Sequence, residues 1–400
     1  MFLQKILKIP IYFLAAICVL IIRIIRPIIL VRIAGLISTR IGHFAANTEL
    51  YLCEHDAGIN VPSQRYIDFF YLTKPISNYQ LANMWRRVLL IGPTWLLSRI
   101  DRINRLTPGG KVHNAFTKTT ALDIHNLLDQ FPPHISFTKE EQILGESNLI
   151  KMGIPVGARF VCLIARDQTY LESVQPRIDF KYHNYRNSDI DNYVLAAEEL
   201  ANRGYFVIRM GSIVKKTIKS NNHKIIDYAT NGMRSDFMDI YLGRYCTFCI
   251  SSGTGWDAIP EIFRRPIVYV NFVPLGHIHT FRSEFLSITK RHVLLETKTL
   301  MRISEILSSG IGFYLKASDF ENVNIELIEN TPEEIYDVVI EMEERLTGKW
   351  IEHEDDKILQ QKFWEIYLNS QSAYNRNRLH GKIKAKFGAA YLRKNQELLQ

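Results

Sequence analysis

A loop of small residues in the second half of the chain has the composition of an anion site. The loop, Ser251, Ser252, Gly253, Thr254 and Gly255, follows a strand-like run and precedes a short segment with helical spacing. Hydroxyls and backbone N–H groups at the start of a helix are suited to hold a phosphate. In an open α/β sheet, ligands bind at the carboxyl ends of the strands, where this loop is expected. The alternative is a tight turn that holds no ligand.

Two arginines are expected beside this loop. Arg166 ends the apolar run 158–165, and Arg209 lies near the end of the run 205–210, and both runs have the composition of strands. A guanidinium presents forked donors that match phosphate oxygens, and its charge offsets that of a departing diphosphate. We therefore predict that both arginines contact a phosphate group. The alternative for Arg166 is an ion pair with an acid such as Asp239.

The connection 179–189 is unusually polar and aromatic, which favours a loop that covers a ligand. His183 and Arg186 are its candidate contacts. Asp189 and Asp191 have the D-x-D spacing of some metal sites, but their place at the start of a helix favours capping. We therefore expect no metal ion here, and an ordinary surface loop is the alternative for the connection.

His43 is the candidate general base of the first half. It follows a strand-like run and a glycine and opens a helical segment. A histidine has a pKa near neutrality and can take the proton of a hydroxyl group. Asn47 and Glu49 are placed to orient it, and Glu54 and Asp56 are weaker candidates for the base. A packed or capping histidine is the alternative.

Composition is that of a large globular chain. It has 400 residues, is 47% hydrophobic and 22% charged, and carries a formal net charge of +8. Zinc-finger spacing, a basic recognition helix and an RNA-binding aromatic signature are all absent from the sequence, so nucleic acid is not an expected partner. Five cysteines, mostly within apolar runs, indicate reduced core residues in a cytosolic compartment.

The N-terminus has the pattern of a membrane element. An apolar run, Ile9 to Ile22, lies between Lys8 and Arg23, and every charge before Glu49 is positive. Arginines at the edge of an apolar helix favour a helix that lies in the surface of an anionic membrane. A single membrane span and a cleaved signal peptide are the alternatives.

Strands alternate with helices over most of the chain, which predicts an α/β fold with doubly wound parallel sheets. The predicted organisation is two Rossmann-like domains that face a cleft, preceded by an N-terminal membrane-anchor helix. The expected boundaries are a membrane anchor at 1–27, an N-terminal Rossmann-like domain at 28–155, a C-terminal Rossmann-like domain at 156–330, and C-terminal helices with a basic tail at 331–400.

Six stretches together carry a family resemblance: RIGHFAANTELYL, ARDQTY, YHNYRNSDIDNY, GYFVIRMGS, SDFMDIYLGRYCTFCISSGTG and FRRPIVYVN. They resemble a bacterial family of surface-polysaccharide glycosyltransferases, over about residues 30 to 285. An arginine at a strand end, a D-x-x-L-x-x-x-C segment and a Ser-rich loop are also similar to GDP-sugar fucosyltransferases. The resemblance implies a GT-B fold, in which Arg166, Arg209 and the loop 251–255 hold the donor nucleotide.

The expected reaction is sugar transfer from a nucleotide-sugar to a lipid-linked or growing glycan, at the cytoplasmic face of the bacterial inner membrane. No aspartate motif in the sequence demands a metal, and we expect an inverting transfer that needs no metal and no cofactor beyond the donor. Alternatives are a transferase that uses CMP-sugars, a sugar-nucleotide epimerase of the same architecture, and a non-catalytic scaffold for polysaccharide assembly.

Overall fold

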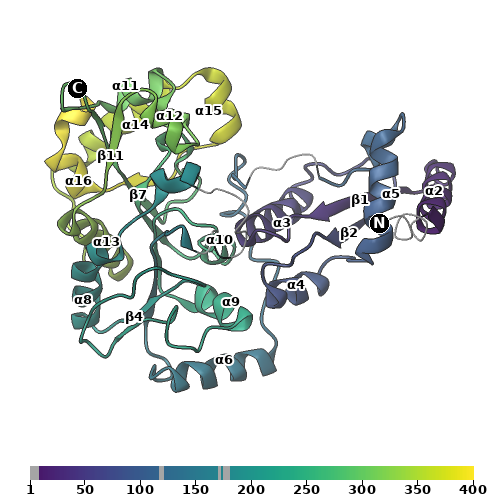
Figure 1. Cartoon of the computed structure of the whole chain (residues 1–400), viewed down its shortest axis with the longest axis horizontal. Coiled ribbons are helices and arrows are strands. Elements are labelled where there is room, and N and C mark those ends of the chain that lie inside the picture. The colour runs from purple at the N-terminus through teal and green to yellow at the C-terminus, as the bar shows by residue number, and fades with distance from the viewer. Residues whose placement is uncertain (1–8, 117–120, 170–172, 174–180) are drawn as a thin grey trace. The chain divides into compact units, whose positions relative to one another are not determined.

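The structure is a computed structural model that describes residues 9–116, 121–169, 173 and 181–400. Its contacts divide the chain into two compact units. The first comprises Met1–Ala121 and Phe131–Thr138, and the second comprises Leu122–Gln130 and Lys139–Gln400. The fold is mixed α/β with a parallel sheet, as the sequence predicts (Figure 1).

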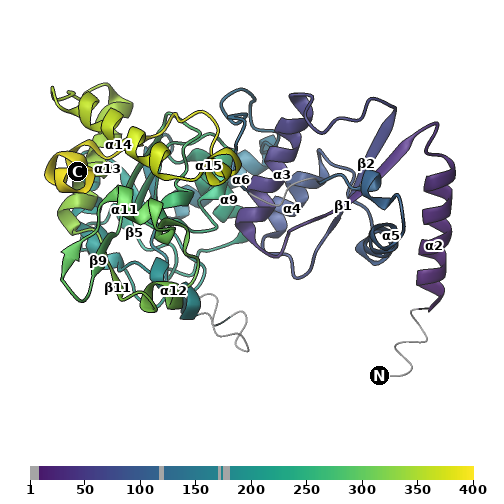
Figure 2. The ribbon, with the colours of Figure 1, turned by 90° about the horizontal axis from the view of Figure 1, so that it is seen from above.

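The first unit is built on two parallel strands. Its elements are α2 (Ile9–Ile24), β1 (Leu30–Leu36), α3 (Ile41–Asp56), β2 (Tyr66–Leu72), α4 (Tyr79–Arg86), α5 (Thr94–Leu106) and the 3-10 helix η1 (Gly110–His113). β1 and β2 pair in register from Leu30↔Tyr66 to Leu36↔Leu72, and single bridges at Phe70↔Ile91 and Ile33↔Asn114 flank them. α3 covers one side of this sheet, and α5 with α2 covers the other (Figures 1 and 2).

Helix α2 is part of the core of the first unit. Ala15 and Val19 are buried in one apolar cluster with Leu97 and Ile100 of α5 and with Val31 of β1. The described part of the predicted anchor, 9–27, is therefore not a separate segment, because one face of α2 completes the packing of the sheet. Among the residues that the structure describes, no helix has the length and apolarity needed to cross a bilayer.

The second unit begins with α6 and contains the main sheet. Its elements up to that sheet's sixth strand are α6 (Lys139–Lys151), β3 (Phe160–Ile164), η2 (Lys181–Arg186), η3 (Ile190–Tyr193), α8 (Val194–Asn202), β4 (Phe206–Arg209), β5 (Ile225–Ile226), α9 (Asp236–Tyr245), β6 (Cys249–Ser251), α10 (Ala258–Ile262), β7 (Ile267–Phe272), η4 (Leu275–His277) and β8 (Phe285–Thr289). Strands β3, β4, β6, β7 and β8 are buried along their whole length, as strands covered on both faces must be, whereas the edge strand β5 is only partly buried.

The rest of the second unit is a small antiparallel sheet and a group of helices. Its elements are β9 (Arg291–Leu294), β10 (Thr299–Leu300), α11 (Ile303–Ser308), η5 (Ile311–Phe313), α12 (Ala317–Glu321), β11 (Ile325–Ile328), α13 (Pro332–Thr347), α14 (Asp356–Ser370), α15 (Ala373–Leu379), β12 (Lys386–Phe387), α16 (Ala389–Lys394) and η6 (Gln396–Leu399). The antiparallel sheet, in the order β10-β9-β11, is absent from the sequence prediction.

The main sheet has the order β12-β8-β7-β6-β3-β4-β5, and all of its pairs are parallel. Chain order therefore runs outward in one direction from β3 to β5 and then in the other direction from β6. This is the doubly wound arrangement, and it places α8 and α13 on one face and α9 and α10 on the other (Figure 1). The carboxyl ends of β3 and β6 form the switch point, where such sheets bind ligands.

Two predicted boundaries differ from the structure. The boundary between the units falls between Thr138 and Lys139 and not at 155, because α6 packs against α9 of the second unit. Gly145 makes this close packing possible, since a Cβ there would lie 1.9 Å from the Tyr241 ring. The tail that was expected as a separate part of the segment 331–400 is also joined to the second unit, because β12 pairs with β8 and Tyr391 is buried.

Substitutions at two neighbouring positions test the role of α2. Val19→Asp should lower the free energy of unfolding by about 3 kcal/mol or more, because it places an unpaired charge in the core cluster. Leu20→Asp is the matched control, because Leu20 is 61% exposed. Thermal unfolding of the full chain measures both. Equal melting temperatures for the two variants would show that α2 is not part of the core.

Candidate functional site

Arg166 and the small-residue loop meet at the switch point of the main sheet. Ile164 of β3 pairs with Ser251 of β6, so the segments that follow these strands leave the sheet side by side. The Ser252 N–H donates to the Ile164 carbonyl at 3.2 Å, and the Ser252 hydroxyl accepts from the Arg166 N–H at 2.8 Å. The fold thus brings together the two features that the sequence analysis placed in one site.

Two guanidinium groups lie close together at this point. Burial and the charge of neighbouring Arg186 lower the pKa of Arg166 to about 10, although the charge of Asp257 opposes the shift. Within the described part of the chain, neither arginine has an acid within ion-pair distance, and the Nε of each is buried without a partner. Asp239, the predicted alternative partner of Arg166, pairs instead with Arg234 at 2.6 Å. The site therefore carries positive charge that an anion would neutralise.

Gly253 allows Arg186 to approach the loop. An Arg186 Nη2 donates to the Gly253 carbonyl. Gly253 has a φ of +75°, and a Cβ there would meet the Phe272 ring at 3.2 Å and Arg186 at 3.5 Å. Any other residue would be strained by the backbone and crowded by these neighbours. Thr254 adds a further donor, because its hydroxyl is buried without a partner in the described structure.

The backbone N–H groups of the loop are less available than the sequence suggested. The Ser252 N–H bonds to β3, the Gly253 N–H donates to the Ser251 hydroxyl at 3.0 Å, and the Thr254 N–H donates to Asp257 at 2.7 Å. The helix that follows, α10, has five residues. These three N–H groups are therefore engaged within the protein, and the arginine side chains are the stronger candidates for contact with an anion.

Asp257 fixes the conformation of the loop 251–255 through hydrogen bonds. Its carboxylate accepts from the Ser251 hydroxyl and from the Thr254 N–H, both at 2.7 Å. Burial raises the pKa of Asp257 to about 6, although these hydrogen bonds and the charge of His279 oppose the rise. Because the carboxylate is occupied within the loop, it fixes the loop conformation and does not pair with the arginines.

The segment that carries Arg186 is tied to the strand ends. The Ser188 N–H donates to the Arg166 carbonyl at 2.9 Å, and Lys290, directly after β8, donates to the Asn187 carbonyl at 2.6 Å. Lys290 is buried, which lowers its pKa, and Glu329 at 3.7 Å partly offsets the effect. These contacts hold the end of the 181–189 segment at the carboxyl edge of the sheet.

Aromatic rings crowd the same segment. His183 lies in η2 with its ring centroid 4.0 Å from that of Tyr182 and 6.4 Å from that of Tyr185. Tyr185 is buried and packs against Phe320 of α12, with centroids 5.4 Å apart. The predicted contact residues His183 and Arg186 thus share one 3-10 turn, whereas positions 179 and 180 lie outside the described residues.

Asp189 and Asp191 have the capping role that the sequence favoured. Asp189 is the N-cap of η3 and accepts from the Asp191 N–H at 3.0 Å. Lys216 binds Asp189 at 2.8 Å and Asp191 at 2.5 Å. Ser188, one residue earlier, bonds to the Tyr193 hydroxyl at 2.8 Å. Both carboxylates are therefore used within the protein.

Arg209 is placed differently from the prediction. Its side chain is 1% exposed, and its guanidinium pairs with Asp227 at 3.4 Å and donates to the Lys216 carbonyl at 3.0 Å. Burial lowers its pKa, and Asp227 and Asp167 oppose that shift. This placement favours a structural role, in which Arg209 fixes the loop after β4, over the predicted contact with a ligand.

His43 lies in the first turn of α3, directly after the loop that follows β1. Burial lowers its pKa below 6.5, although a contact with Asn47 at 3.5 Å opposes the shift. The imidazole is therefore neutral at pH 7 and has the protonation state that a general base requires. Of the two predicted orienting groups, Asn47 lies near the ring, whereas Glu49 is bound to a different histidine.

That histidine, His134, forms a cluster with metal-binding side-chain types. Atoms of Glu49, Cys53 and His134 lie within 4.8 Å of one another. His134 approaches Glu49 at 3.1 Å through Nδ1 and Asp56 at 3.0 Å through Nε2. Burial opposes protonation, but hydrogen bonds to Cys53, Glu49 and Asp56 outweigh it and raise the pKa to about 10. A protonated imidazole between two carboxylates accounts for the geometry, and Asp56 is thereby occupied.

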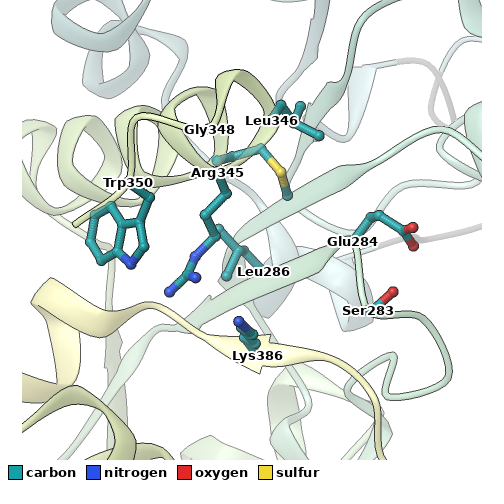
Figure 3. Close-up of a pocket in the computed structure, with 9 residues that line it drawn as sticks. Ser283, Glu284, Leu286, Arg345, Leu346, Gly348, Trp350 and Lys386 are labelled. Carbon is teal, nitrogen blue, oxygen red and sulfur yellow. The ribbon is translucent and has the colours of Figure 1, made fainter. Parts of the chain in front are cut away.

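A separate hollow of about 360 Å³ lies at the other edge of the sheet. Ser283 and Glu284 precede β8, and Arg345 and Lys386 point toward the middle of the hollow opposite the ring of Trp350 (Figure 3). Because it opens at the amino end of β8, it lies away from the edge where doubly wound sheets bind ligands.

Two residues important to the switch point were missed by sequence reasoning. Lys290 follows a strand and precedes Arg291, so nothing in the sequence distinguishes it from a surface lysine. Asp257 stands three residues after Thr254, which is the spacing of a residue that accepts a loop N–H. The sequence could therefore have predicted that Asp257 accepts a hydrogen bond from the loop.

The buried Asp257 carboxylate predicts a pH effect on stability. The pKa of Asp257 in the folded state, about 6, lies above the ordinary aspartate value of 3.8, so its contribution to stability is fully present below pH 3.8 and is lost as the pH rises through 6. The free energy of unfolding of the wild type should fall by about 3 kcal/mol relative to Asp257→Asn between these limits. Denaturant titrations at both pH values measure the difference, and a pH-independent difference would contradict the assignment.

Comparisons with known proteins give distant structural similarity only. No protein-family model and no curated protein matches the chain. Heptosyltransferase II of E. coli, which acts with ADP-heptose, is 11% identical with a TM-score of 0.37, over 65% of this chain and 90% of its own. A family 9 glycosyl transferase from Veillonella parvula is 12% identical with a TM-score of 0.36, and the match covers 60% of this chain and 80% of the transferase.

A third similar structure is TibC, an iron-containing dodecameric glycosyltransferase from enterotoxigenic E. coli, which is 8% identical with a TM-score of 0.31, over 62% and 59% of the two chains. All three structures are glycosyltransferases by description, the class that the sequence resemblance indicates. At these scores the overlap is weak, and the function proposed below rests on the residues of this chain.

Proposed function

We propose that the chain is a glycosyltransferase that takes a sugar from a nucleotide-sugar and transfers it to a glycan. The observation that carries this proposal is the pair of arginines at the switch point of a doubly wound sheet, Arg166 and Arg186, which have no ion-pair partner among the described residues. In the proposed GT-B arrangement the second unit is the donor domain, and the first is the acceptor domain.

The donor diphosphate is assigned to the arginine pair and to the Thr254 hydroxyl. Forked guanidinium donors suit two adjacent phosphate groups, and partial burial strengthens each contact. The same charges would stabilise the departing nucleotide diphosphate, which is the task that a metal ion performs in other transferases. We therefore propose a transfer that is independent of metal ions.

The acceptor hydroxyl is assigned to His43 of the first unit. The neutral imidazole takes the hydroxyl proton while the oxygen attacks the anomeric carbon, and the bond from that carbon to the diphosphate breaks. The acceptor is a lipid-linked or growing surface glycan at the cytoplasmic face of the bacterial inner membrane. A sugar-nucleotide epimerase, by contrast, would turn over donor without acceptor.

Arg166→Ala should weaken binding of a nucleoside diphosphate by about 10- to 100-fold, because a buried charge-assisted contact is lost. Arg186→Ala should act in the same direction. Isothermal titration of the full chain with UDP, GDP and CMP measures the affinity and identifies the nucleotide. Arg302→Ala is the control, because it removes an exposed arginine of the same unit with the same change of charge.

Unchanged affinity in a folded Arg166→Ala protein would remove the donor site from the switch point. If the wild type binds none of the nucleotides, the scaffold alternative gains and the transferase proposal fails. Preference for CMP over the diphosphates would indicate a donor with a monophosphate leaving group.

His43→Ala should reduce kcat by about 10²- to 10⁴-fold and leave nucleotide affinity unchanged. In the wild type, activity should fall only as the pH drops through a value below 6.5, because burial lowers the His43 pKa. His55→Ala, on the same helix, is the matched control. A turnover assay with the identified donor decides the point, and near-normal turnover of His43→Ala would assign the base to another residue.

A further inference from the structure

The outer face of α2 is a continuous apolar stripe exposed to solvent. Phe13, Ile17, Leu20 and Ile24 follow one another at spacings of four, three and four residues, which places them on one side of a helix. Phe13 is 69% exposed and Ile24 is 76% exposed. The opposite side of α2 is buried in the core of the first unit. Exposure of this extent on one helix indicates a surface that is covered in use.

Helix α5 carries a second stripe with the same spacing. Trp95, Arg99, Arg102 and Leu106 lie along one side of it, and Trp95 and Leu106 are exposed. The two apolar ends with two arginines between them form the pattern of a helix at a membrane surface, where tryptophan and arginine bind at the level of the headgroups.

Contacts between the two helices fix the stripes relative to each other. The Arg99 guanidinium lies over the Tyr12 ring of α2, 5.4 Å from its centroid. Further along, Arg23 of α2 donates to the Thr107 hydroxyl at 2.6 Å and to the Asn104 side chain at 3.2 Å. The helices therefore run in the same direction.

The solvent-exposed charged side chains of α2 and α5 and of the residues directly after α2 are all positive. Arg26 and Arg102 are exposed, and Arg99 and Arg105 are at least partly so. Asp101 is the single acid in the ranges 9–28 and 94–106, all of which the structure describes, and it is buried and paired with Arg105 at 2.8 Å. A surface with an apolar centre and a cationic flank complements a bilayer that contains anionic lipids.

We propose that α2 and α5 together form a docking surface for an anionic lipid bilayer, which we call the α2–α5 face. It comprises the stripe 13, 17, 20 and 24 and the stripe 95, 99, 102 and 106. Since Ala15 and Val19 are held in the core, only the outer side of α2 is available, and the helix lies in the plane of the interface with its apolar side chains in the acyl boundary. The proposal extends the proposed function by placing the acceptor unit on the membrane that holds a lipid-linked acceptor.

Vesicle flotation of the full chain tests the surface, with phosphatidylcholine vesicles that contain or lack phosphatidylglycerol. The triple variant Phe13→Ser, Leu20→Ser, Ile24→Ser should lose at least about tenfold in affinity. Arg99→Ala and Arg102→Ala should each lose about fivefold on anionic vesicles only, and added salt should remove that difference. The control is Ile143→Ser with Ile150→Ser, which removes exposed apolar side chains from α6 of the other unit.

Retention of full vesicle affinity by a folded triple variant would overturn the proposal. Equal binding to both kinds of vesicle would also overturn it, because the anionic part of the assignment would fail. If the wild type is a dimer that the triple variant converts to a monomer, and vesicles bind neither, the face is an interface between two copies. Arg166→Ala should bind vesicles normally, so failure of the donor site and failure of the lipid surface are distinguishable.

Discussion

The site depends on one electrostatic constraint, which is that two guanidinium groups are held together and neither has an ion-pair partner among the described residues. Folding places Arg166 at the end of β3 and Arg186 on η2, and the hydrogen bonds of Ser252, Ser188 and Lys290 prevent the two segments from separating. A pKa of about 10 for Arg166 corresponds to about 3 kcal/mol of unfavourable interaction in the charged form. An anion that binds there removes this cost, so the fold supplies part of the binding energy in advance.

The sequence predicted the doubly wound region well because its signals are local. Apolar runs, glycines after helices and the residues at strand ends determine β3, β4, β6 and β7, and their connections follow from handedness. It failed at Arg209, since an arginine at a strand end has the same local signature whether its side chain faces a ligand or an internal acid. Asp227, which decides the matter, lies 18 residues later in a loop without periodicity.

Contacts that join distant segments explain the other differences. The C-terminal tail contains seven basic residues between Asn375 and Lys394, yet β12 within it completes the sheet beside β8. Two residues of strand are too short to give a pattern. For α2 the difficulty is different, because a helix that is apolar on all sides gives no sequence signal for the side that packs inward. Only the structure shows that Ala15 and Val19 lie in the core with α5, whereas Phe13 and Ile24 are exposed.

Helix α2 has a buried side that stabilises the first unit and an exposed side that is the proposed membrane contact. Its inner face belongs to the same small sheet that positions α3 and His43, so a bilayer bound to the outer face would be held at a fixed distance from the proposed base. A flexible anchor would only raise the local concentration of the acceptor. An anchor that is part of the acceptor unit also restricts its orientation, and orientation of the reacting groups contributes more to a transfer rate than proximity alone. The exposed apolar stripe is then a cost in water that the membrane removes.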